Sequence, residues 1–165
     1  MVAIMAILAG VAVPQVGSAM RLYALNGSTR AVAAAIRGAR YTAVSKNRTV
    51  RVRFNCPAAG QYRVVEFVSS AAVDSAADRC SEQAYPYPDP DAAAAPNVDG
   101  PIVRLSTDAQ FTAVQDIQFD TAGRASRLTG CPACATAAAP AAVTIGNGHE
   151  TRTLTVTASG QVVVP

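Results

Sequence analysis

Residues 31–54 read AVAAAIRGARYTAVSKNRTVRVRF, and within this stretch the spacing of the apolar residues changes from that of a helix to that of a strand. Up to residue 43, apolar side chains recur every three or four positions, which indicates one buried stripe on an α-helix. From Val50 they recur at every second position, with Arg51 and Arg53 between them, which indicates a half-buried strand. The sequence therefore predicts a long helix that leads directly into a β domain.

The helical pattern extends upstream as far as Gln15. Residues 15–47 contain no proline and are rich in Ala, Arg and Leu, which favour helix. The predicted stripe carries small side chains, which suit packing on a sheet better than a free coiled coil. Its residues are Leu22, Leu25, Thr29, Val32, Ile36, Ala39 and Ala43.

Downstream, short apolar segments separated by turn residues predict several strands. The strand that begins at Thr49 is followed by predicted strands at 61–68, 101–105, 112–120, 143–145, 151–157 and 161–164. Gly146-Asn147-Gly148 is typical of a hairpin loop. One long helix followed by about seven short strands indicates an α+β fold, with antiparallel sheets packed on the helix.

The first 13 residues, MVAIMAILAGVAV, form an apolar run that ends at Pro14. As a helix this run rises about 20 Å, which is too short for the roughly 30 Å hydrocarbon core of a bilayer. No basic region precedes it, as a cleavable signal peptide would require. Three interpretations follow: a buried core helix, a signal remnant, or a membrane helix whose first turns lie upstream. We divide the chain into an apolar helix (1–20), an amphipathic stem helix (21–47) and a β domain (48–165).

Residues 69–101 interrupt the strand pattern, first with Ser and Ala and then with closely spaced prolines. Proline at this density prevents pairing inside a sheet, so we expect a surface loop.

The four cysteines are an even number in a small chain, which is typical of disulfides in an oxidising compartment. Three pairings are possible, and we favour Cys56 with Cys80 and Cys131 with Cys134. The Cys-Pro-Ala-Cys motif at 131–134 also allows a zinc site, with Cys56 and Cys80 as further ligands, or a redox site.

Basic and acidic residues are separated along a chain whose net charge is +3. Residues 1–65 contain basic side chains and no acidic one, whereas all 11 carboxylates lie between Glu66 and Glu150. This asymmetry suggests a basic stem next to a more acidic head, although a solvated helix flank explains it equally well. The residues of a candidate basic surface in the β domain are Arg51, Arg53, Arg124 and Arg127.

Four segments, in this order and spacing, resemble the GspH/FimT family of minor pseudopilins. VAIMAILAGVAVP (2–14) is similar to the end of the apolar helix with which pilins and pseudopilins begin, with Pro14 at its characteristic kink. AAAIRGARYTAVSKNRTVRV (33–52) resembles the family's helix-to-strand junction. IQFDTAGRAS (117–126) resembles a strand that meets a Gly-Arg turn, and TRTLTVTASGQVVV (151–164) resembles the final hairpin. The resemblance covers most of the chain outside residues 69–101.

In this family a basic leader, a glycine and a Phe-Thr-Leu-Ile-Glu segment precede the apolar helix, and the phenylalanine is methylated after cleavage. Either these residues lie upstream and Met1 is a start assigned too late, or the chain is a truncated relative of the family, and we favour the late start. With the upstream residues, the helix would hold about 20 apolar residues, enough to span a bilayer. The residues of the implied membrane and filament helix are Met1, Ile4, Ile7, Leu8, Val11, Val13 and Pro14.

The resemblance implies a structural subunit of a type II secretion pseudopilus or a type IV pilus, acting in protein secretion or filament assembly. Such a subunit would be held in the bacterial inner membrane by a single span, with its C-terminal domain in the periplasm and other pilin subunits as partners. It needs no catalysis, cofactor or metal, and the sequence contains no recognisable nucleophile, phosphate-loop or metal-helix motif. We expect His149 to cap a turn, and Asp116 and Asp120 to share one face of a strand.

Two other functions remain open. Some FimT-like pilins bind DNA through basic residues near the last turn, but residues 159–164 contain none. Only the four arginines of the candidate basic surface would then supply the cations that phosphate contacts need. The other alternative is a soluble periplasmic binding module, for which residues 1–20 would be dispensable.

Overall fold

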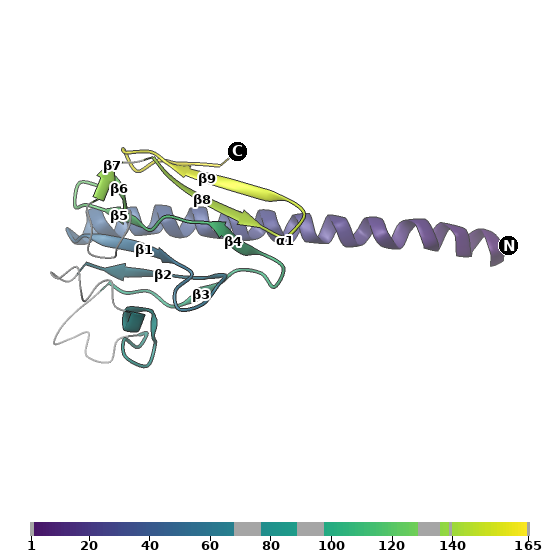
Figure 1. Ribbon diagram of the computed structural model, residues 1–165, viewed down its shortest axis with the longest axis horizontal. Coiled ribbons are helices and arrows are strands. Elements are labelled where there is room, and N and C mark those ends of the chain that lie inside the picture. Colours follow the sequence, from purple (N-terminus) through teal and green to yellow (C-terminus); the bar gives the residue numbers. More distant parts are fainter. Residues whose placement is uncertain (1, 68–76, 89–97, 129–135, 139, 165) are drawn as a thin grey trace.

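The computed structural model describes the backbone of residues 2–67, 77–88, 98–128, 136–138 and 140–164, and the side chains of these residues except 2–16, 77–78 and 136–138. One helix, α1 (Val2–Lys46), is unbroken, and its N-terminal part projects from the β domain (Figure 1). It is followed by Asn47, whose φ of 52° lies in the left-handed region that commonly terminates helices. The predicted long helix and its end are therefore confirmed.

In the described part of the chain, ten strands form two antiparallel sheets. Sheet A has the strand order β3-β2-β1-β5-β6-β7, and sheet B has the order β10-β9-β8-β4. The strands are β1 (Val50–Phe54), β2 (Gln61–Glu66), β3 (Val103–Arg104), β4 (Gln110–Ala113), β5 (Ile117–Phe119), β6 (Ala125–Leu128), β7 (Thr136–Ala138), β8 (Ala141–Gly146), β9 (Thr151–Val156) and β10 (Val162–Val163).

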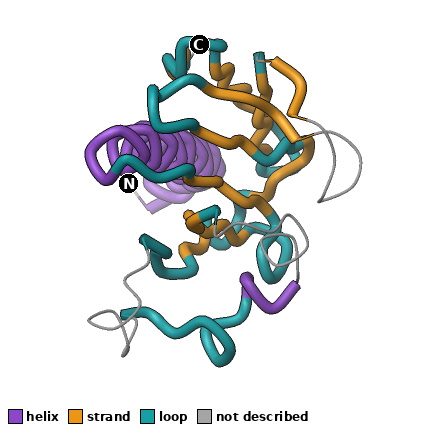
Figure 2. Tube along the Cα trace, turned by 90° about the vertical axis from the view of Figure 1, so that its left-hand side faces the viewer, coloured by secondary structure: helices purple, strands orange, loops and turns teal. Residues whose placement is uncertain are grey.

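Both sheets pack on α1 and share one core with it. The helix contacts β1 and β5 of sheet A and β8, β9 and β10 of sheet B, and an end-on view shows it beside both sheets (Figure 2). Six of the seven predicted stripe residues are buried, from Leu25 to Ala43, and Leu22 is half-buried. The sheets contribute the buried residues Val50, Val52, Ile117, Phe119, Val143, Ile145, Leu154 and Val156.

The α+β architecture is as predicted, but the single strand predicted over 112–120 is wrong. The structure divides this segment into β4, in sheet B, and β5, in sheet A. At the crossing, the Asp116 carboxylate accepts a hydrogen bond from the backbone N–H of Phe54 (3.0 Å), and the Leu128 N–H donates to the Asp116 carbonyl (3.0 Å). The segment looks like one strand in the sequence because no proline or glycine marks the crossing. The strands β6 and β7 were also not predicted, which accounts for the larger strand number.

Among the described residues, no helix is long and apolar enough to cross a membrane. The predicted transmembrane helix is thus not supported. The described side chains of α1 begin at Gly17 and include Arg21 and Arg30, whereas the apolar residues predicted for membrane contact lie in the part described only as backbone.

The predicted surface loop is tied to the edge of sheet A by a disulfide. Cys56, just after β1, is bonded to Cys80 at the end of the 3-10 helix η1 (Ala77–Cys80), as predicted. This bond makes both cysteines unavailable as zinc ligands. The other predicted pair, Cys131 with Cys134, lies outside the described residues.

A buried arginine joins the loop to the sheet. Arg63 of β2 is completely buried, and its guanidinium donates hydrogen bonds to the carbonyl oxygens of Arg79 (2.9 Å), Tyr85 (2.7 Å) and Gly100 (2.8 Å). A buried charge is tolerated only where such partners replace water. Arg63 therefore fixes the course of residues 77–88 and 98–100, the described parts of the predicted loop, which contain no strand.

A buried ion pair between Arg79 and Asp99 also holds the predicted loop on the sheet. The guanidinium of Arg79 lies 2.8 Å from the carboxylate of Asp99, which also accepts the backbone N–H of Glu66 (2.7 Å). Burial raises the pKa of Asp99, against the lowering effects of the Glu66 hydrogen bond and of Arg79. Arg79 also donates to the carbonyl of Glu66 (2.8 Å), so Arg79 and Asp99 of the predicted loop are both bonded to the last residue of β2.

We predict that Arg63→Met lowers the free energy of unfolding by about 3 kcal/mol, because it leaves buried carbonyl groups without donors. Urea unfolding of the purified chain measures this change. Arg104→Met, on the exposed side chain of β3, is the matched control and should change stability by less than about 0.5 kcal/mol. Equal stability of the Arg63→Met variant and the natural chain would contradict the role of Arg63.

Candidate functional site

One side of α1 packs on the sheets and the opposite side is exposed. Large exposed side chains lie at both ends of this side, Met20 (66% exposed) and Tyr23 (78%) near its start and Tyr41 (74%) near its end. Between them the exposed positions include only small residues and arginines. We call this surface the exposed helix face, formed by Met20, Tyr23, Gly27, Arg30, Ala31, Ala34, Gly38 and Tyr41.

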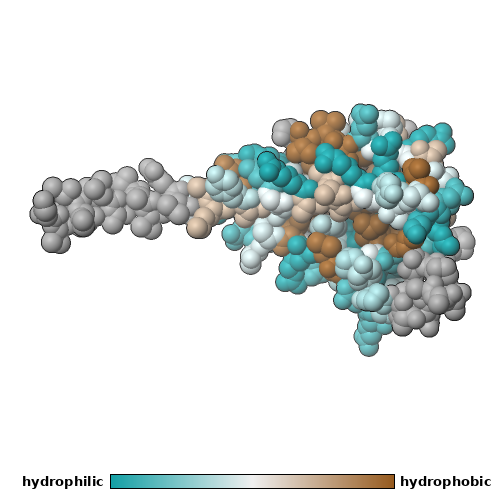
Figure 3. All heavy atoms as spheres, turned by 180° about the vertical axis from the view of Figure 1, so that it is seen from behind, coloured by the Kyte–Doolittle hydropathy of each residue, from teal (hydrophilic) through white to brown (hydrophobic). Residues whose placement is uncertain are grey.

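Two glycines in this face have no packing role in the described domain. A Cβ atom added at Gly27 or Gly38 would have no neighbour within 4 Å. Glycine inside a helix is about 1 kcal/mol less favourable than alanine. The fold of the chain itself therefore gives no reason for glycine at either position, whereas close approach of another helix would. Figure 3 shows the domain from behind, with hydrophobic and hydrophilic residues interspersed on this side.

Beside this face, α1 and the last strand form a groove of about 590 Å³. Its helix wall carries Arg37, Arg40, Tyr41 and Val44, and its other wall is residues 160–163. We call it the stem groove.

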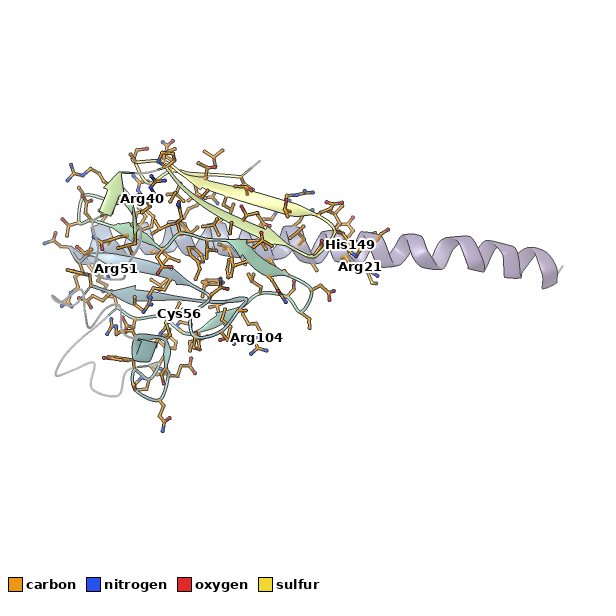
Figure 4. The ribbon with its side chains drawn as sticks, in the orientation of Figure 1. Arg21, Arg40, Arg51, Cys56, Arg104 and His149 are labelled. Carbon is orange, nitrogen blue, oxygen red and sulfur yellow. A yellow bond between two sulfur atoms is a disulfide. The ribbon has the colours of Figure 1, made fainter. Side chains whose placement is uncertain are left out.

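Two glycine turns close one end of the stem groove around Arg40. Gly123 and Gly160 have φ angles of 75° and 76°, which favour glycine. A Cβ atom on Gly160 would lie 2.4 Å from the Gly123 carbonyl oxygen and 2.8 Å from Arg40 Nε. Arg40 Nε donates a hydrogen bond to the Gly123 carbonyl oxygen (3.0 Å), and this bond fixes the position of the guanidinium. Arg40 is labelled in Figure 4.

At the opposite end of the domain, the tip of the β8–β9 hairpin lies against α1. Arg21 donates to Nε2 of His149 (3.1 Å), and Figure 4 shows the two side chains next to each other. The prediction that His149 caps the turn is wrong, because the side chain of Asn147 accepts the backbone N–H groups of His149 (3.0 Å) and Glu150 (2.8 Å). The predicted hairpin loop at 146–148 is confirmed.

The structure does not bring the four arginines of the candidate basic surface together. Arg51 is buried, and its Nε donates a hydrogen bond to the Gln118 amide oxygen (2.7 Å). The side chain of Arg124, by contrast, is 76% exposed. The register places Arg127 beside Ile117 and Val52, on the core face of sheet A, whereas Arg51 lies on the other face. Two of the four also face carboxylates, Arg53 at 3.7 Å and Arg124 at 2.8 Å.

Those carboxylates, Asp116 and Asp120, lie in different settings rather than on one strand face. Burial raises the pKa of Asp116 above its ordinary value, although the hydrogen bond from Phe54 and the charge of Arg53 act in the opposite direction. Burial alone would also raise the pKa of Asp120, but the hydrogen bonds that this turn residue accepts from Arg124 and Ala122 lower it overall.

Comparison with known proteins gives one family match and two similar folds. The family model described as "Type II transport protein GspH" matches residues 28–160. Two crystal forms of the type IV minor pilin FimU of Pseudomonas aeruginosa share the fold at 13% sequence identity. Their TM-scores are 0.53 and 0.51, with 86% of this chain and 87% or 92% of FimU covered. No curated protein matches the sequence.

We predict that Asp116→Asn removes part of the pH dependence of stability. Because the folded-state pKa of Asp116 is raised, the folded state binds more protons than the unfolded state between the two pKa values. Stability contributed by this group is therefore present below the unfolded pKa and lost as pH rises through the folded one. Asparagine keeps an acceptor for the Phe54 N–H but does not titrate, so the stability difference between variant and natural chain should shift in favour of the variant as pH rises. Urea unfolding from pH 3.5 to 7 measures this, and a constant difference would contradict it.

Proposed function

This chain belongs to the GspH family, and on that premise we propose that it is a minor pseudopilin, a structural subunit of a type II secretion pseudopilus or a type IV pilus. A subunit of this kind acts by packing into a filament and requires no catalytic step, so we assign the chain no enzymatic activity. The single observation that carries the assembly role is the exposed helix face, with Gly27 and Gly38 open to a neighbour.

The exposed helix face has the composition of a helix-packing surface. Small residues let two helix backbones approach closely, and the large side chains of Tyr23 and Tyr41 would border the contact. Exposed apolar side chains gathered on one face also mark interaction surfaces of soluble domains. We propose that residues 1–20 extend this contact as the filament helix and that residues 21–47 connect it to the β domain, with Pro14 near the centre of the filament part.

The proposed location is the bacterial cell envelope, with the β domain in the periplasm. The Cys56–Cys80 disulfide supports this, because such bonds persist in oxidising compartments. Before assembly, residues 1–20 would be held at the inner membrane, and other pilin or pseudopilin subunits would replace lipid as their neighbours in the filament.

We expect Gly38→Leu to block assembly without weakening the domain. Leucine favours helix over glycine by somewhat less than 1 kcal/mol, and its Cβ atom would have no neighbour within 4 Å, so we expect stability to stay equal or rise. The same side chain would hold a neighbouring helix away. Urea unfolding measures the first effect, and the amount of chain in filaments sheared from cells measures the second.

Gly38→Ala is the matched control, because it gives a similar gain in helix propensity with only one added carbon. It should assemble better than Gly38→Leu. Incorporation of Gly38→Leu at the level of the natural chain would count against the exposed helix face as the packing surface.

A further inference from the structure

The stem groove exposes the free edge of sheet B. β10 is the last strand in the order of that sheet, and β9 is its neighbour. The Thr157 N–H donates to the Gln161 carbonyl (2.9 Å), so the alternation of an antiparallel pair directs the N–H and carbonyl of the next residue, Val162, away from β9. Arg37 donates to that carbonyl at 3.4 Å, which places the outward edge of β10 on the side of α1.

The charged side chains that line the groove are all basic. Arg37 and Arg40 both line it, and its described lining includes no acidic residue. Within the described part of the chain, each of these guanidiniums bonds only to a backbone carbonyl, of Val162 and Gly123 respectively. Several other arginines of the domain lie beside carboxylates, namely Arg48, Arg53, Arg79 and Arg124.

The remaining lining is apolar and accessible. Val163 is 53% exposed, and Val44 on the helix wall is 50% exposed. An edge strand with outward-facing backbone groups, apolar neighbours and nearby cations combines the features that recognise an extended peptide, since the backbone supplies affinity and the alternating side chains supply specificity. A peptide N–H that pairs with the Val162 carbonyl would share it with Arg37 or replace Arg37 there.

We propose that the stem groove binds an extended acidic segment of another filament subunit. The segment would add alongside β10, pair with the backbone of Val162, and place a carboxylate between Arg37 and Arg40. Guanidinium and carboxylate form directional, charge-assisted hydrogen bonds, which fix the position of the segment along the short strand. That the partner is a filament subunit rests on the proposed assembly role. That the groove binds an acidic peptide rests only on the residues that line the groove.

The test uses the full chain in detergent and a synthetic peptide, acetyl-Val-Asp-Val-Asp-Val-amide. Titration into the ¹⁵N-labelled chain should shift the amide resonances of Gly160, Val162 and Val163. The peptide with Asn in place of Asp should bind about fivefold more weakly, because exposed charge pairs contribute up to about 1 kcal/mol.

Variants of the two arginine positions on the same helix sharpen the test. Arg37→Glu should weaken binding of the Asp peptide by about fivefold and improve binding of a Lys peptide of the same pattern. Arg30→Glu changes the same charge on α1 outside the groove and should leave binding unchanged. Equal binding by both variants, equal binding of the Asp and Asn peptides, or shifts confined to other parts of the domain would overturn the proposal.

A single-stranded oligonucleotide and inorganic phosphate are titrated in parallel. Shifts of the same amides by either of these, without shifts from the Asp peptide, would overturn the peptide assignment in favour of a phosphate ligand. Because the peptide measurement uses unassembled chain, it is independent of filament formation. Peptide binding together with normal assembly of Gly38→Leu would therefore refute the helix-packing surface and leave the groove assignment standing.

Discussion

The architecture depends on the burial of one narrow stripe of α1 against two sheets at once. The stripe from Leu25 to Ala43 is built mainly of small and β-branched side chains, so the helix lies close to β1 and β5 on one side and to β8 and β9 on the other. Apolar burial stabilises by roughly 25 cal/mol per Å², and this shared core is the largest such surface in the described domain. Because the two sheets meet on the helix, the chain must cross between them, and one of these crossings, from β4 to β5, lies at Asp116.

The outer face of sheet A is held together by a different kind of contact. There, charged side chains are buried with their partners instead of apolar ones. Arg63 and the Arg79–Asp99 pair satisfy backbone groups of the described parts of the proline-rich segment, where no strand forms, and the disulfide from Cys56 holds Cys80 of that segment in place. Such contacts determine one conformation for the loop more than they add stability, because the desolvation of the charges offsets much of their attraction.

These two packings leave free the surfaces to which we assign function. The stripe occupies one side of α1. The opposite side, with its small residues between exposed tyrosines, is therefore free to contact another subunit. The same arrangement sets β10 next to the helix and creates the stem groove where sheet B ends. Assembly by helix packing and capture of an extended segment would therefore use adjacent but distinct surfaces of one subunit.

The sequence by itself determined the long helix, the α+β class, the final hairpins and the Cys56–Cys80 pairing preference, because these follow from residue spacing and local turn chemistry. It did not determine which strands belong to which sheet: residues 112–120 look like one strand because no proline or glycine marks the point where the chain crosses between the sheets. Nor could spacing show that Arg51 and Arg63 are buried, that Arg127 lies on the core face, or that Arg37 and Arg40 meet β10. Those outcomes were decided by the tertiary structure, because burial and charge pairing depend on segments that are distant in sequence and meet only when the sheets close on the helix.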